Sequence, residues 1–598
     1  MEFRLPWPTR ARRSGRPLPG RERRPGRDRW DTWEAPRAHV LCVARTLTSA
    51  TRLLDVLPLL RREDGIETYY TVNPGSAFAE GLPAYFTSLG VGDRLLSWEE
   101  ATRRPFDLAV ACTVNNSMRQ LDAPLVVLPH GAGYNRLVTE TTGDASAPAG
   151  LSRRELTWRG KVVPAAIGVS HSEQLGRLAG SCPEAVERAA VVGDICLDRI
   201  RRSLPLRDRY RALLGAVDGR RLVVLHSTWS SHSLLGTHPE LPLELVTSLP
   251  VDEYAVAAVL HPNVWARHSR RGVLERLERA MDAGLLVIPP EEGWRAAVVA
   301  GDWVVGDHGS TSLYSAALDR TVLLAATGLD ELDAASPTAG FARRAPRLDV
   351  AGDLYAQLLR ADAEHDPDLL APVVDSQWEA PDKSTVLTQD LLYGLLADAG
   401  VGAPAATPEP EPVPDPKPLA HRAPTAFDVT GRVGADGAVE IQRHPLAPRH
   451  AVEPRGFYAV TDEETHPLWP QSADVLARTL VDAATPPTVW AEEAFRRLPG
   501  LSVVGAALDT DRCLVRVRDG RVWEAQADRP WGAARARLDP VLVACAVHVA
   551  ASSDAGTAGG TELGEPLVIR TGRHLCRVSF RVAPGDPGKG EPRSCSGG

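Results

Sequence analysis

Long apolar runs are missing from this sequence. No stretch approaches the ~18 consecutive apolar residues that a membrane-spanning helix needs. The arginine-rich start also lacks the following apolar segment that a secretory signal contains. We therefore expect a protein that stays in the cytoplasm.

Paired cysteines are missing as well. The eight cysteines form no Cys-x-x-Cys pair, and several lie in apolar, strand-like runs; they are Cys42, Cys112, Cys182, Cys196, Cys513, Cys545, Cys576 and Cys595. Such spacing favours buried, reduced thiols over a zinc site or a disulfide framework. The sequence also contains no His-Glu-x-x-His motif and no cluster of cysteine and histidine, so we expect no bound metal.

Two catalytic signatures are absent, and the overall charge is negative. There is no G-x-S-x-G motif to carry a hydrolase serine and no G-x-x-x-x-G-K-[ST] loop to carry a nucleoside triphosphate. The formal net charge is −8. Because nucleic-acid binding depends on clustered Lys and Arg that neutralise phosphates, we expect no nucleic-acid partner.

Positive charge is concentrated near the start of the chain. Residues 10–29 read RARRSGRPLPGRERRPGRDR, with almost no large apolar side chain. A segment of this composition is expected to be a disordered, solvated tail. If it has a role, its charge favours contact with anionic lipid head groups, which would hold the protein at the inner face of the membrane.

The body of the chain alternates apolar strands with amphipathic helices, in two successive series. The first series has strands at His39–Val43, Ile66–Val72, Leu95–Trp98, Leu108–Val114 and Leu125–Leu128. The second has strands at Leu222–Leu225, Tyr254–Leu260, Leu285–Ile288, Trp303–Val305 and Val322–Ala325, with a helix predicted over Val264–Met281. Continuous apolar strands separated by helices indicate a parallel sheet covered on both faces. The sequence therefore predicts an α/β fold with two doubly wound lobes that face each other.

A proline-rich stretch marks the clearest domain boundary. Residues 401–425 include PEPEPVPDPKP, whose prolines favour an extended, semi-rigid linker. Beyond it, Asp436-Gly437 and Asp519-Gly520 separate pairs of short strands, which is typical of β-hairpins. With 598 residues the chain exceeds what one core supports. The predicted parts are a tail at 1–37, lobes at 38–200 and 201–400, the linker, a small α+β domain at 426–585 and a loose tail at 586–598.

A histidine follows a strand of the first lobe, in the segment Leu128-Pro129-His130-Gly131-Ala132-Gly133. In open α/β sheets, ligands bind at the carboxyl ends of the strands. A histidine there can take a proton from a hydroxyl near neutral pH, and the glycines let backbone N–H groups approach a ligand. The structural alternative is a strand-ending histidine that only bonds a neighbouring carbonyl.

A second histidine occupies the same kind of position in the second lobe. It lies in Leu260-His261-Pro262-Asn263, with Arg267 one turn further on. Pro262 forces the chain out of the strand and places His261 at the rim of the expected cleft. An imidazole at this point could donate a hydrogen bond to a phosphate; an incidental histidine before a proline is the alternative.

The third segment runs from a strand into a helix and reads Gly306-Asp307-His308-Gly309-Ser310-Thr311-Ser312. Hydroxyl residues at a helix start, together with free N–H groups and the helix dipole, suit a phosphate or pyrophosphate. Simple N-capping is the structural alternative. Trp229 follows the first strand of the second lobe and is expected to line the same opening.

Taken in order, these motifs resemble the CDP-glycerol glycerophosphotransferase family, the GT-B-fold enzymes that polymerise teichoic-acid-type polyol phosphate chains. The resemblance spans about residues 38–400 and rests on His130-Gly131, Val192–Arg199, Leu225–Trp229, His261–Asn263 and Asp307–Ser312. It implies two Rossmann-like lobes, with the acceptor on the first lobe and the nucleotide donor on the second. The last domain is left without a role.

The resemblance also implies a division of labour among the site residues. His130 would be the general base for the acceptor hydroxyl, and His261 with the Ser310–Ser312 helix start would hold the donor pyrophosphate. We count His261 and Asp307 with His130 as the catalytic candidates. The donor phosphates would be held by Gly309, Ser310, Thr311, Ser312 and Arg267, and the cleft would be lined by Gly131, Arg136, Trp229 and Asn263. Attack on the glycerol-bearing phosphorus of CDP-glycerol would release CMP with no cofactor beyond the donor. A membrane-attached polymer is one hydroxyl acceptor that this reading allows.

Two positions depart from the family pattern. Members usually carry a lysine about five positions after the His-Gly pair, whereas this chain has Asn135 and Arg136 there. They also commonly show Asp-Tyr-Ser-Ser where this chain has Asp307-His308-Gly309-Ser310. Two alternatives therefore stay open, a UDP-sugar 2-epimerase-like enzyme on the same fold and a non-catalytic protein that binds a nucleotide or a partner.

Overall fold

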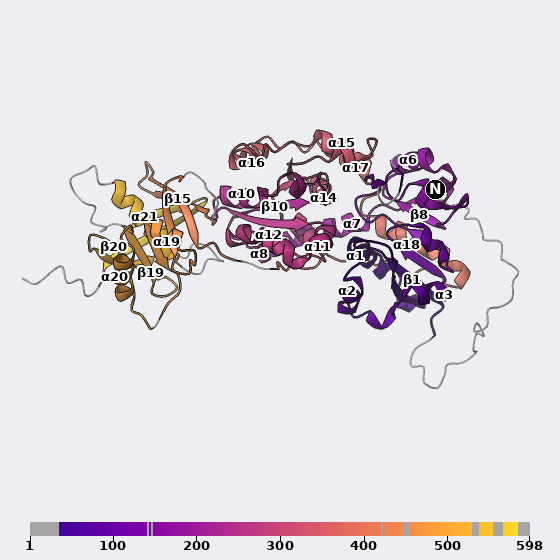
Figure 1. Ribbon diagram of the computed structural model, residues 1–598, viewed down its shortest axis with the longest axis horizontal. Coiled ribbons are helices and arrows are strands. Elements are labelled where there is room, and N and C mark those ends of the chain that lie inside the picture. Colours follow the sequence, from indigo (N-terminus) through magenta and orange to yellow (C-terminus); the bar gives the residue numbers. More distant parts are fainter. Residues whose placement is uncertain are drawn as a thin grey trace, which may run out of the picture.

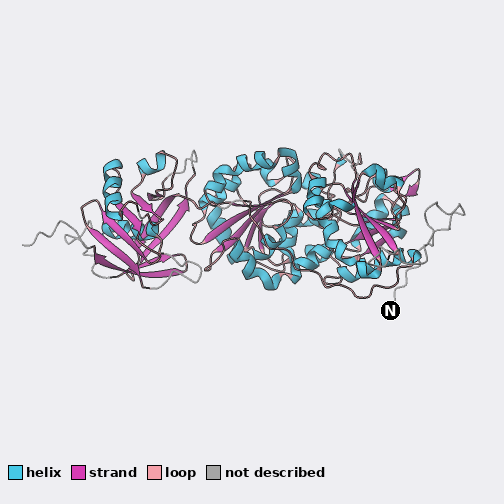
Figure 2. Cartoon of the chain, turned by 90° about the horizontal axis from the view of Figure 1, so that it is seen from below, coloured by secondary structure: helices cyan, strands magenta, loops and turns pink. Residues whose placement is uncertain are grey.

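The computed structural model describes eight stretches of the chain, residues 35–139, 143–144, 147–419, 422–447, 454–482, 484–528, 538–553 and 566–583. They form three bodies in a row, two α/β lobes and a terminal barrel (Figure 1). Figure 2 shows the strands of the three bodies as three separate groups along the same axis. The predicted basic arm and the predicted C-terminal tail lie outside the described residues.

The first lobe contains a seven-stranded parallel sheet in the order β3-β2-β1-β4-β5-β8-β9. Its strands are β1 (Ala38–Ala44), β2 (Ile66–Val72), β3 (Leu95–Leu96), β4 (Leu108–Ala111), β5 (Leu125–Val127), β8 (Ala166–Val169) and β9 (Ala189–Val191). A two-stranded hairpin, β6 (Thr157–Trp158) and β7 (Lys161–Val162), lies apart from the sheet. Strand order reverses between β1 and β4, which places a topological switch point there.

Helices cover both faces of this sheet, because apolar side chains point to both faces along β1. Val40 and Cys42 belong to one core, and Leu41 and Val43 to the core on the other face. The helical segments are α1 (Leu47–Val56), η1 (Leu57–Leu59), η2 (Arg62–Asp64), α2 (Leu82–Ser88), η3 (Gly92–Arg94), α3 (Trp98–Arg103), η4 (Asn116–Gln120), α5 (Arg153–Leu156), α6 (Glu173–Ser181) and η5 (Pro183–Arg188).

The second lobe repeats the plan with a five-stranded parallel sheet in the order β12-β11-β10-β13-β14. Its strands are β10 (Arg221–Ser227), β11 (Tyr254–Leu260), β12 (Leu286–Ile288), β13 (Trp303–Gly306) and β14 (Thr321–Leu324). Here strand order reverses between β10 and β13. The two parallel sheets confirm the mixed α/β fold with two doubly wound lobes.

The helices of the second lobe again lie on both sides of its sheet. They are α7 (Ile195–Arg202), η6 (Leu204–Leu206), α8 (Arg207–Leu213), α9 (Leu234–Thr237), α10 (Leu241–Ser248), α11 (Pro262–His268), α12 (Arg270–Asp282), α13 (Trp294–Ala300), α14 (Ser310–Ala317), η7 (Leu329–Glu331), α15 (Pro337–Arg344), α16 (Leu354–Ala363) and α17 (Ala371–Gln377). The single helix predicted over 264–281 is thus two helices. Ser269 separates them, since its φ of 61° lies in the left-handed region.

One helix that follows the second lobe in sequence packs on the first. Leu391, Leu392, Tyr393 and Leu396 of α18 (Ser384–Leu396) belong to the same core as β1, and η8 (Ala397–Ala399) follows. The range predicted for the second lobe therefore ends in a helix that crosses back to the first lobe. This crossing ties the lobes together through the core and not only through the loops between them.

The proline-rich linker has no helix or strand over 401–419, as its composition predicts, but it is docked on the second lobe. Val413 is buried in that lobe's core, its N–H donates to Ser203 Oγ at 2.8 Å, and its carbonyl accepts from the Tyr210 hydroxyl. Leu419 N–H donates to the Val287 carbonyl at 2.9 Å. The linker therefore fixes the path of the chain toward the last domain.

The last domain is a closed nine-stranded barrel, which the predicted small α+β domain did not anticipate. In barrel order its strands are β15 (Ala426–Val433), β16 (Val439–Pro445), β22 (Leu567–Thr571), β23 (His574–Val582), β21 (Val522–Ala527), β20 (Arg512–Val517), β19 (Val503–Ala507), β18 (Val475–Arg478) and β17 (Phe457–Thr461). The two predicted hairpins are present as β15–β16 and β20–β21. The domain also contains the helices α19 (Leu468–Ser472), α20 (Pro487–Arg497) and α21 (Pro540–Ser553). The apolar side chains of α21 fill the barrel core.

The described residues also bear on the cysteine and membrane expectations. The seven cysteines among them are free and buried, while Cys595 lies outside. Burial raises the pKa of Cys42 to about 12, which keeps this thiol protonated and unreactive. Across the described ranges, no helix combines the length and the apolar character needed to cross a membrane, and no group of side chains has the makeup of a metal site.

We predict that the crossing helix contributes to the stability of the first lobe. Leu392→Ala removes a fully buried side chain and should lower the free energy of unfolding by about 2–5 kcal/mol. Val386→Ala, on the same helix but 44% exposed, should change it by less than about 0.5 kcal/mol. Urea unfolding followed by circular dichroism measures both; equal effects would mean that α18 does not pack as described.

Candidate functional site

A cavity of about 650 Å³ lies between the two lobes, at the carboxyl ends of both sheets. The switch point of the first sheet contributes Arg45 after β1 and Thr113 after β4. The switch point of the second contributes Thr228 after β10 and His308 after β13. The two switch points therefore open into one cavity, which is where ligands of doubly wound folds bind.

The predicted histidine loop and the predicted helix start meet in this cavity. Ala132 N–H donates to Ser310 Oγ at 3.2 Å, although the two residues are 178 positions apart. A Cβ at Gly131 would lie 3.0 Å from the same oxygen, a tight contact, so the lack of a side chain at residue 131 favours this close approach of the loop to the helix. His130 and Ser310 both line the cavity. The structure thus brings together the imidazole and the phosphate-suited helix end.

His130 is neutral over the physiological pH range. Burial and the neighbouring Arg52 charge lower its pKa to about 4, and a hydrogen bond with the Cys112 backbone opposes them. That bond engages one ring nitrogen and leaves the other as a proton acceptor. His130 is therefore in the form that a general base requires, with a low basicity.

His261 is held in the tautomer that carries its proton on Nε2, so it can donate a hydrogen bond. Burial, and then the charge of Arg136 and the nearby His130 and His226, lower its pKa well below the ordinary value. Its Nδ1 accepts from the Asn263 N–H at 3.1 Å as the N-cap of α11. In a neutral ring whose Nδ1 accepts, Nε2 carries the proton. His261 also lines the cavity, so its remaining N–H is suited to an anionic group.

Three of the predicted site residues do not line the cavity, namely Asp307, Ser312 and Arg267. Asp307 is fully buried, and its carboxylate accepts from the N–H groups of Thr228, Leu234 and Gly309 at 2.8–3.0 Å. Asp307 therefore holds the loop after β10 in place and does not line the cavity. Ser312 is fully buried against His226, with 3.3 Å between its Oγ and the His226 Nδ1, because the helix turns its third residue toward the sheet. Arg267 is exposed on the outer side of α11.

The remaining predicted residues do line the cavity: Gly131, Arg136, Trp229, Asn263, Gly309 and Thr311. The Trp229 ring has Phe78 at 5.4 Å and His261 at 6.4 Å between ring centroids. The Arg136 guanidinium lies 4.2 Å above the same indole. These contacts make Trp229 the aromatic wall of the cavity.

Both departures from the family pattern converge on Glu331. Arg136 Nη2 donates to Glu331 Oε2 and to the Trp229 carbonyl, each at 2.7 Å. His308 Nε2 lies 3.2 Å from the same carboxylate oxygen. Burial would raise the pKa of Glu331, but the His308 hydrogen bond and the Arg136 charge lower it to about 2. Arg136 therefore bridges the lobes instead of offering an unpaired cation to a ligand.

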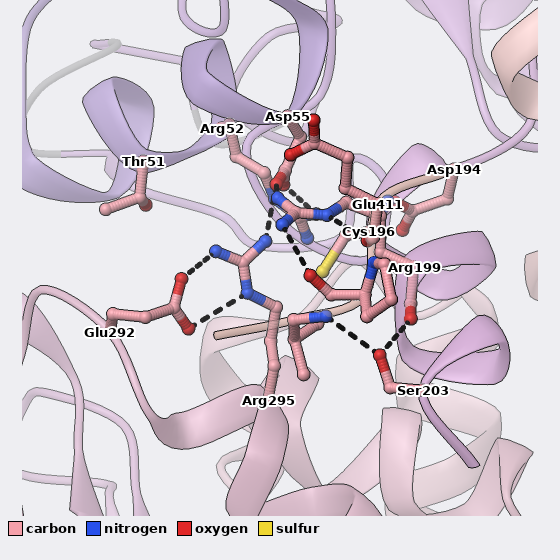
Figure 3. Close-up of polar contacts among 12 residues, drawn as sticks. Thr51, Arg52, Asp55, Asp194, Cys196, Arg199, Ser203, Glu292, Arg295 and Glu411 are labelled. Atoms are coloured by element: carbon pink, nitrogen blue, oxygen red, sulfur yellow. Dashed lines mark hydrogen bonds and ion pairs between the residues drawn. The ribbon is translucent and has the colours of Figure 1, made fainter. Parts of the chain in front are cut away.

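A buried charge cluster at the floor of the cavity was not predicted from the sequence. Asp55 of α1 binds Arg199 of α7 and Arg295 of α13, and lies 3.5 Å from Arg52 Nη1 (Figure 3). Arg295 also binds Glu292. The three arginines facing Asp55 are buried residues, at most 9% exposed, so the cluster joins the first lobe to the second inside the protein. Its one sequence signal is Arg and Asp three positions apart on the apolar face of α1.

A second acidic residue, Asp194, completes the charge balance. Its carboxylate lies 3.4 Å from Arg52 and accepts from the Tyr314 hydroxyl and, at 3.1 Å, from Trp378 Nε1. Burial would raise the pKa of Asp55, but Arg295, Arg199 and Arg52 lower it. The guanidinium charges at the cavity floor are therefore already neutralised by carboxylates.

Glu155 is an acidic cavity residue that the sequence reading also missed. It lies in α5 and its Oε2 accepts from the Gly150 N–H at 2.8 Å. Burial raises its pKa to about 7, against the Gly150 hydrogen bond and the Arg45 charge, while Asp144 acts in the same direction as burial. At neutral pH this carboxyl can therefore both accept and donate a hydrogen bond.

Comparison with known proteins gives likenesses only at the level of whole structures. No family model matches the chain, and no curated protein matches it in sequence. Similar solved structures include the wall teichoic acid polymerase TagF, at 10% identity and a TM-score of 0.43, covering 61% of this chain and 90% of that chain.

UDP-GlcNAc 2-epimerases are also similar. The Neisseria meningitidis enzyme bound to UDP-GlcNAc is 13% identical with a TM-score of 0.39, covering 59% of this chain and all of that chain. The Methanocaldococcus jannaschii enzyme is 11% identical with a TM-score of 0.37, covering 60% and 100%.

We predict that the buried cluster is essential for stability. Asp55→Asn keeps the side-chain volume but leaves the facing guanidinium groups without a full counter-charge, and should cost about 3–5 kcal/mol of unfolding free energy. Glu275→Gln is the matched control, because Glu275 pairs with Arg271 on the surface and is 58% exposed; its effect should stay within about 0.5 kcal/mol. Chemical denaturation measures both, and a loss for Asp55→Asn no larger than the control would contradict the role.

We also predict a pH-dependent gain of stability in Glu155→Gln. Because the folded pKa of about 7 exceeds the ordinary 4.5, ionisation of Glu155 destabilises the fold increasingly as pH rises from 4.5 to 7. The amide variant avoids this cost, so its advantage should be absent below pH 4.5 and reach at most about 3 kcal/mol above pH 7. Thermal unfolding from pH 4.5 to 8 tests this, with Glu63→Gln as the surface control in the same lobe. A difference that does not vary with pH would refute it.

Proposed function

We propose that this protein is a transferase that moves a phosphoryl-linked group, such as glycerophosphate, or a sugar from a nucleotide-diphosphate donor to a hydroxyl acceptor. The single observation that carries the proposal is the meeting of the His130 loop and the Ser310 helix start in one cavity between two switch points. A neutral imidazole and a helix end suited to phosphate would then line one space large enough for a small ligand.

The donor side is supported by neutral hydrogen-bond donors. Ser310 and Thr311 begin α14, which has no side-chain cap at its start, and the Ser312 N–H donates to the Gly309 carbonyl. The first N–H groups of a helix have no carbonyl of a preceding turn to bond. The Nε2–H of His261 lies on the same cavity wall. Since Arg52 and Arg295 are neutralised by Asp55 and its neighbours, charge on the transferred group would be met mainly by these fixed dipoles. Preorganised donors of this kind are a main source of phosphoryl-transfer catalysis.

On the acceptor side, His130 would take the proton of the attacking hydroxyl. The acceptor oxygen would form a bond to the donor phosphorus, or to the sugar carbon of a sugar donor, and the nucleotide would leave with the electrons of the broken bond. Asp307 would act only by holding the loop that carries Thr228 and Trp229. The donor is a substrate and the chain needs no other organic group for this step.

Nucleotide release tests the proposal directly. The full-length protein is incubated with CDP-glycerol or a panel of nucleotide sugars and a polyol acceptor, and the freed nucleotide is separated by chromatography. His130→Ala should slow nucleotide release by about 10²–10⁴-fold. His39→Ala should not change the rate, because His39 lies near the amino end of β1 and the cavity lies beyond its carboxyl end. No release with any donor would refute the transferase, and conversion of a UDP-sugar without acceptor would identify a 2-epimerase instead. Tight nucleotide binding without turnover would identify a non-catalytic protein.

The pH profile offers a separate test of His130. A base acts in its deprotonated form, so the rate should fall as pH drops through about 4, where His130 becomes protonated. A falling limb centred near 6.5 would mean that an unshifted histidine is the base. Initial rates, corrected for protein unfolded at each pH by circular dichroism, provide the measurement.

A further inference from the structure

A short segment of the second lobe, residues 328–333, is bonded to the first lobe beside the cavity. It contains η7 and lies between β14 and α15. The Glu331 carbonyl accepts from the Leu137 N–H at 2.8 Å, and the Asp333 N–H donates to the Asn135 carbonyl at 2.9 Å. These bonds form an antiparallel β-bridge between the lobes. The segment therefore belongs to one lobe in sequence and pairs with the other.

Ion pairs, and few apolar contacts, accompany this bridge. Arg136 Nη2 binds Glu331 Oε2 at 2.7 Å, and Arg177 Nη1 binds Asp333 Oδ2 at 3.1 Å. The buried apolar side chain of the segment is Leu332. Among the described residues, it packs in a small separate cluster with two alanines of α15. A segment with so little apolar packing can open locally without unfolding of the lobe.

The segment also covers a polar atom that lacks a partner. His308 is 3% exposed, and its Nδ1 is buried without a hydrogen-bond partner in the described part of the chain. A Cβ at Gly328 would lie 2.2 Å from this nitrogen, a contact that only glycine avoids without displacing the imidazole. An unsatisfied buried nitrogen costs free energy, which is regained when water or a ligand reaches it. This cost favours release of the segment.

Other contacts hold the lobes together independently of the segment. The floor cluster around Asp55 lies inside the protein, and the Asp194 N–H donates to Ser384 Oγ of α18 at 2.8 Å. Small residues flank the segment, with Gly328 at φ 50° on one side and the exposed Ala334-Ala335 on the other. Such positions can absorb a change of chain direction. The segment can therefore move while both lobes stay in place.

We propose that residues 328–333 form a lid, which releases the first lobe to admit ligands while the floor cluster keeps the two lobes together. Release breaks the two backbone hydrogen bonds and the two ion pairs, and it withdraws Leu332 from the cavity wall. The same step uncovers His308, which also lines the cavity. The lid acts on any ligand of the cavity, so it does not depend on the proposed transfer reaction.

Hydrogen–deuterium exchange of the full-length protein, resolved to single amides by mass spectrometry, tests the lid. After correction for intrinsic rates, the Leu137 and Asp333 amides should exchange at similar rates. Both should be at least about a hundredfold faster than the Val224 amide in the middle of β10. The Asp194 amide should stay slow, because it belongs to the contacts that hold the lobes together.

A charge-removing variant tests the role of the central carboxylate. Glu331→Gln should speed exchange of the Leu137 amide about tenfold, because charge-assisted hydrogen bonds become neutral ones. The Val224 rate should not change. Asp330→Asn is the matched control, since Asp330 is an exposed carboxyl of the same segment, and it should leave the Leu137 rate as in wild type. Circular dichroism shows whether each variant is folded.

Four results would overturn the lid. Leu137 exchange as slow as that of Val224 in wild type would mean that the segment opens only when the protein unfolds. Exchange of Asp194 at the Leu137 rate would mean that the whole lobes separate. Equal Leu137 rates in Glu331→Gln and wild type would remove the role of the ion pair. Faster Val224 exchange in that variant would show general destabilisation in place of local release.

Discussion

The arrangement of the two lobes depends on the buried carboxylate of Asp55. It lies on α1 and binds Arg199 and Arg295, which belong to helices of the second lobe. Because an unpaired charge at this depth would cost several kcal/mol, these helices can adopt few relative positions other than the one that satisfies every partner. The cluster forms the floor of the cavity, so the same contacts that join the lobes set the spacing between His130 and Ser310. Geometry at the site is thus fixed by electrostatics outside the reacting groups.

The same cluster determines which charges the cavity presents. Its acidic groups already neutralise the cations at the floor, and burial keeps His130 and His261 uncharged. A bound phosphate would therefore meet hydrogen bonds and a helix end in place of free guanidinium groups. A bound hydroxyl would have His130, a weak but unprotonated base, as its proton acceptor. In such a site the arginines hold the two lobes together, and neutral hydrogen-bond donors would bind the phosphate.

Sequence patterns predicted the strands and the loops at their carboxyl ends, since both depend on local periodicity and on the rule that parallel strands end at one edge. His130, His261 and the start of α14 therefore fell in the cavity as expected. The direction of Asp307 could not be predicted, because it depends on three backbone N–H groups that only the folded loop brings near. The pairing of Asp55 with Arg295 spans 240 positions, and no local pattern encodes it. Barrel closure likewise depends on the pairing of β16 with β22 across more than a hundred residues.

The described part of the barrel lies away from the cavity and contributes none of its lining residues. Arg443 of β16 binds Asp252 through two hydrogen bonds of 2.9 and 2.7 Å, next to the amino ends of the second-lobe strands. The cavity lies at the carboxyl ends of the same strands, so the whole thickness of that lobe separates the two (Figure 1). The interior of the barrel is filled by α21. This helix packs so tightly that a Cβ at Gly505 would lie 2.8 Å from the Pro540 carbonyl oxygen. The docked linker and the Arg443–Asp252 pair join the barrel to the second lobe on the side away from the cleft.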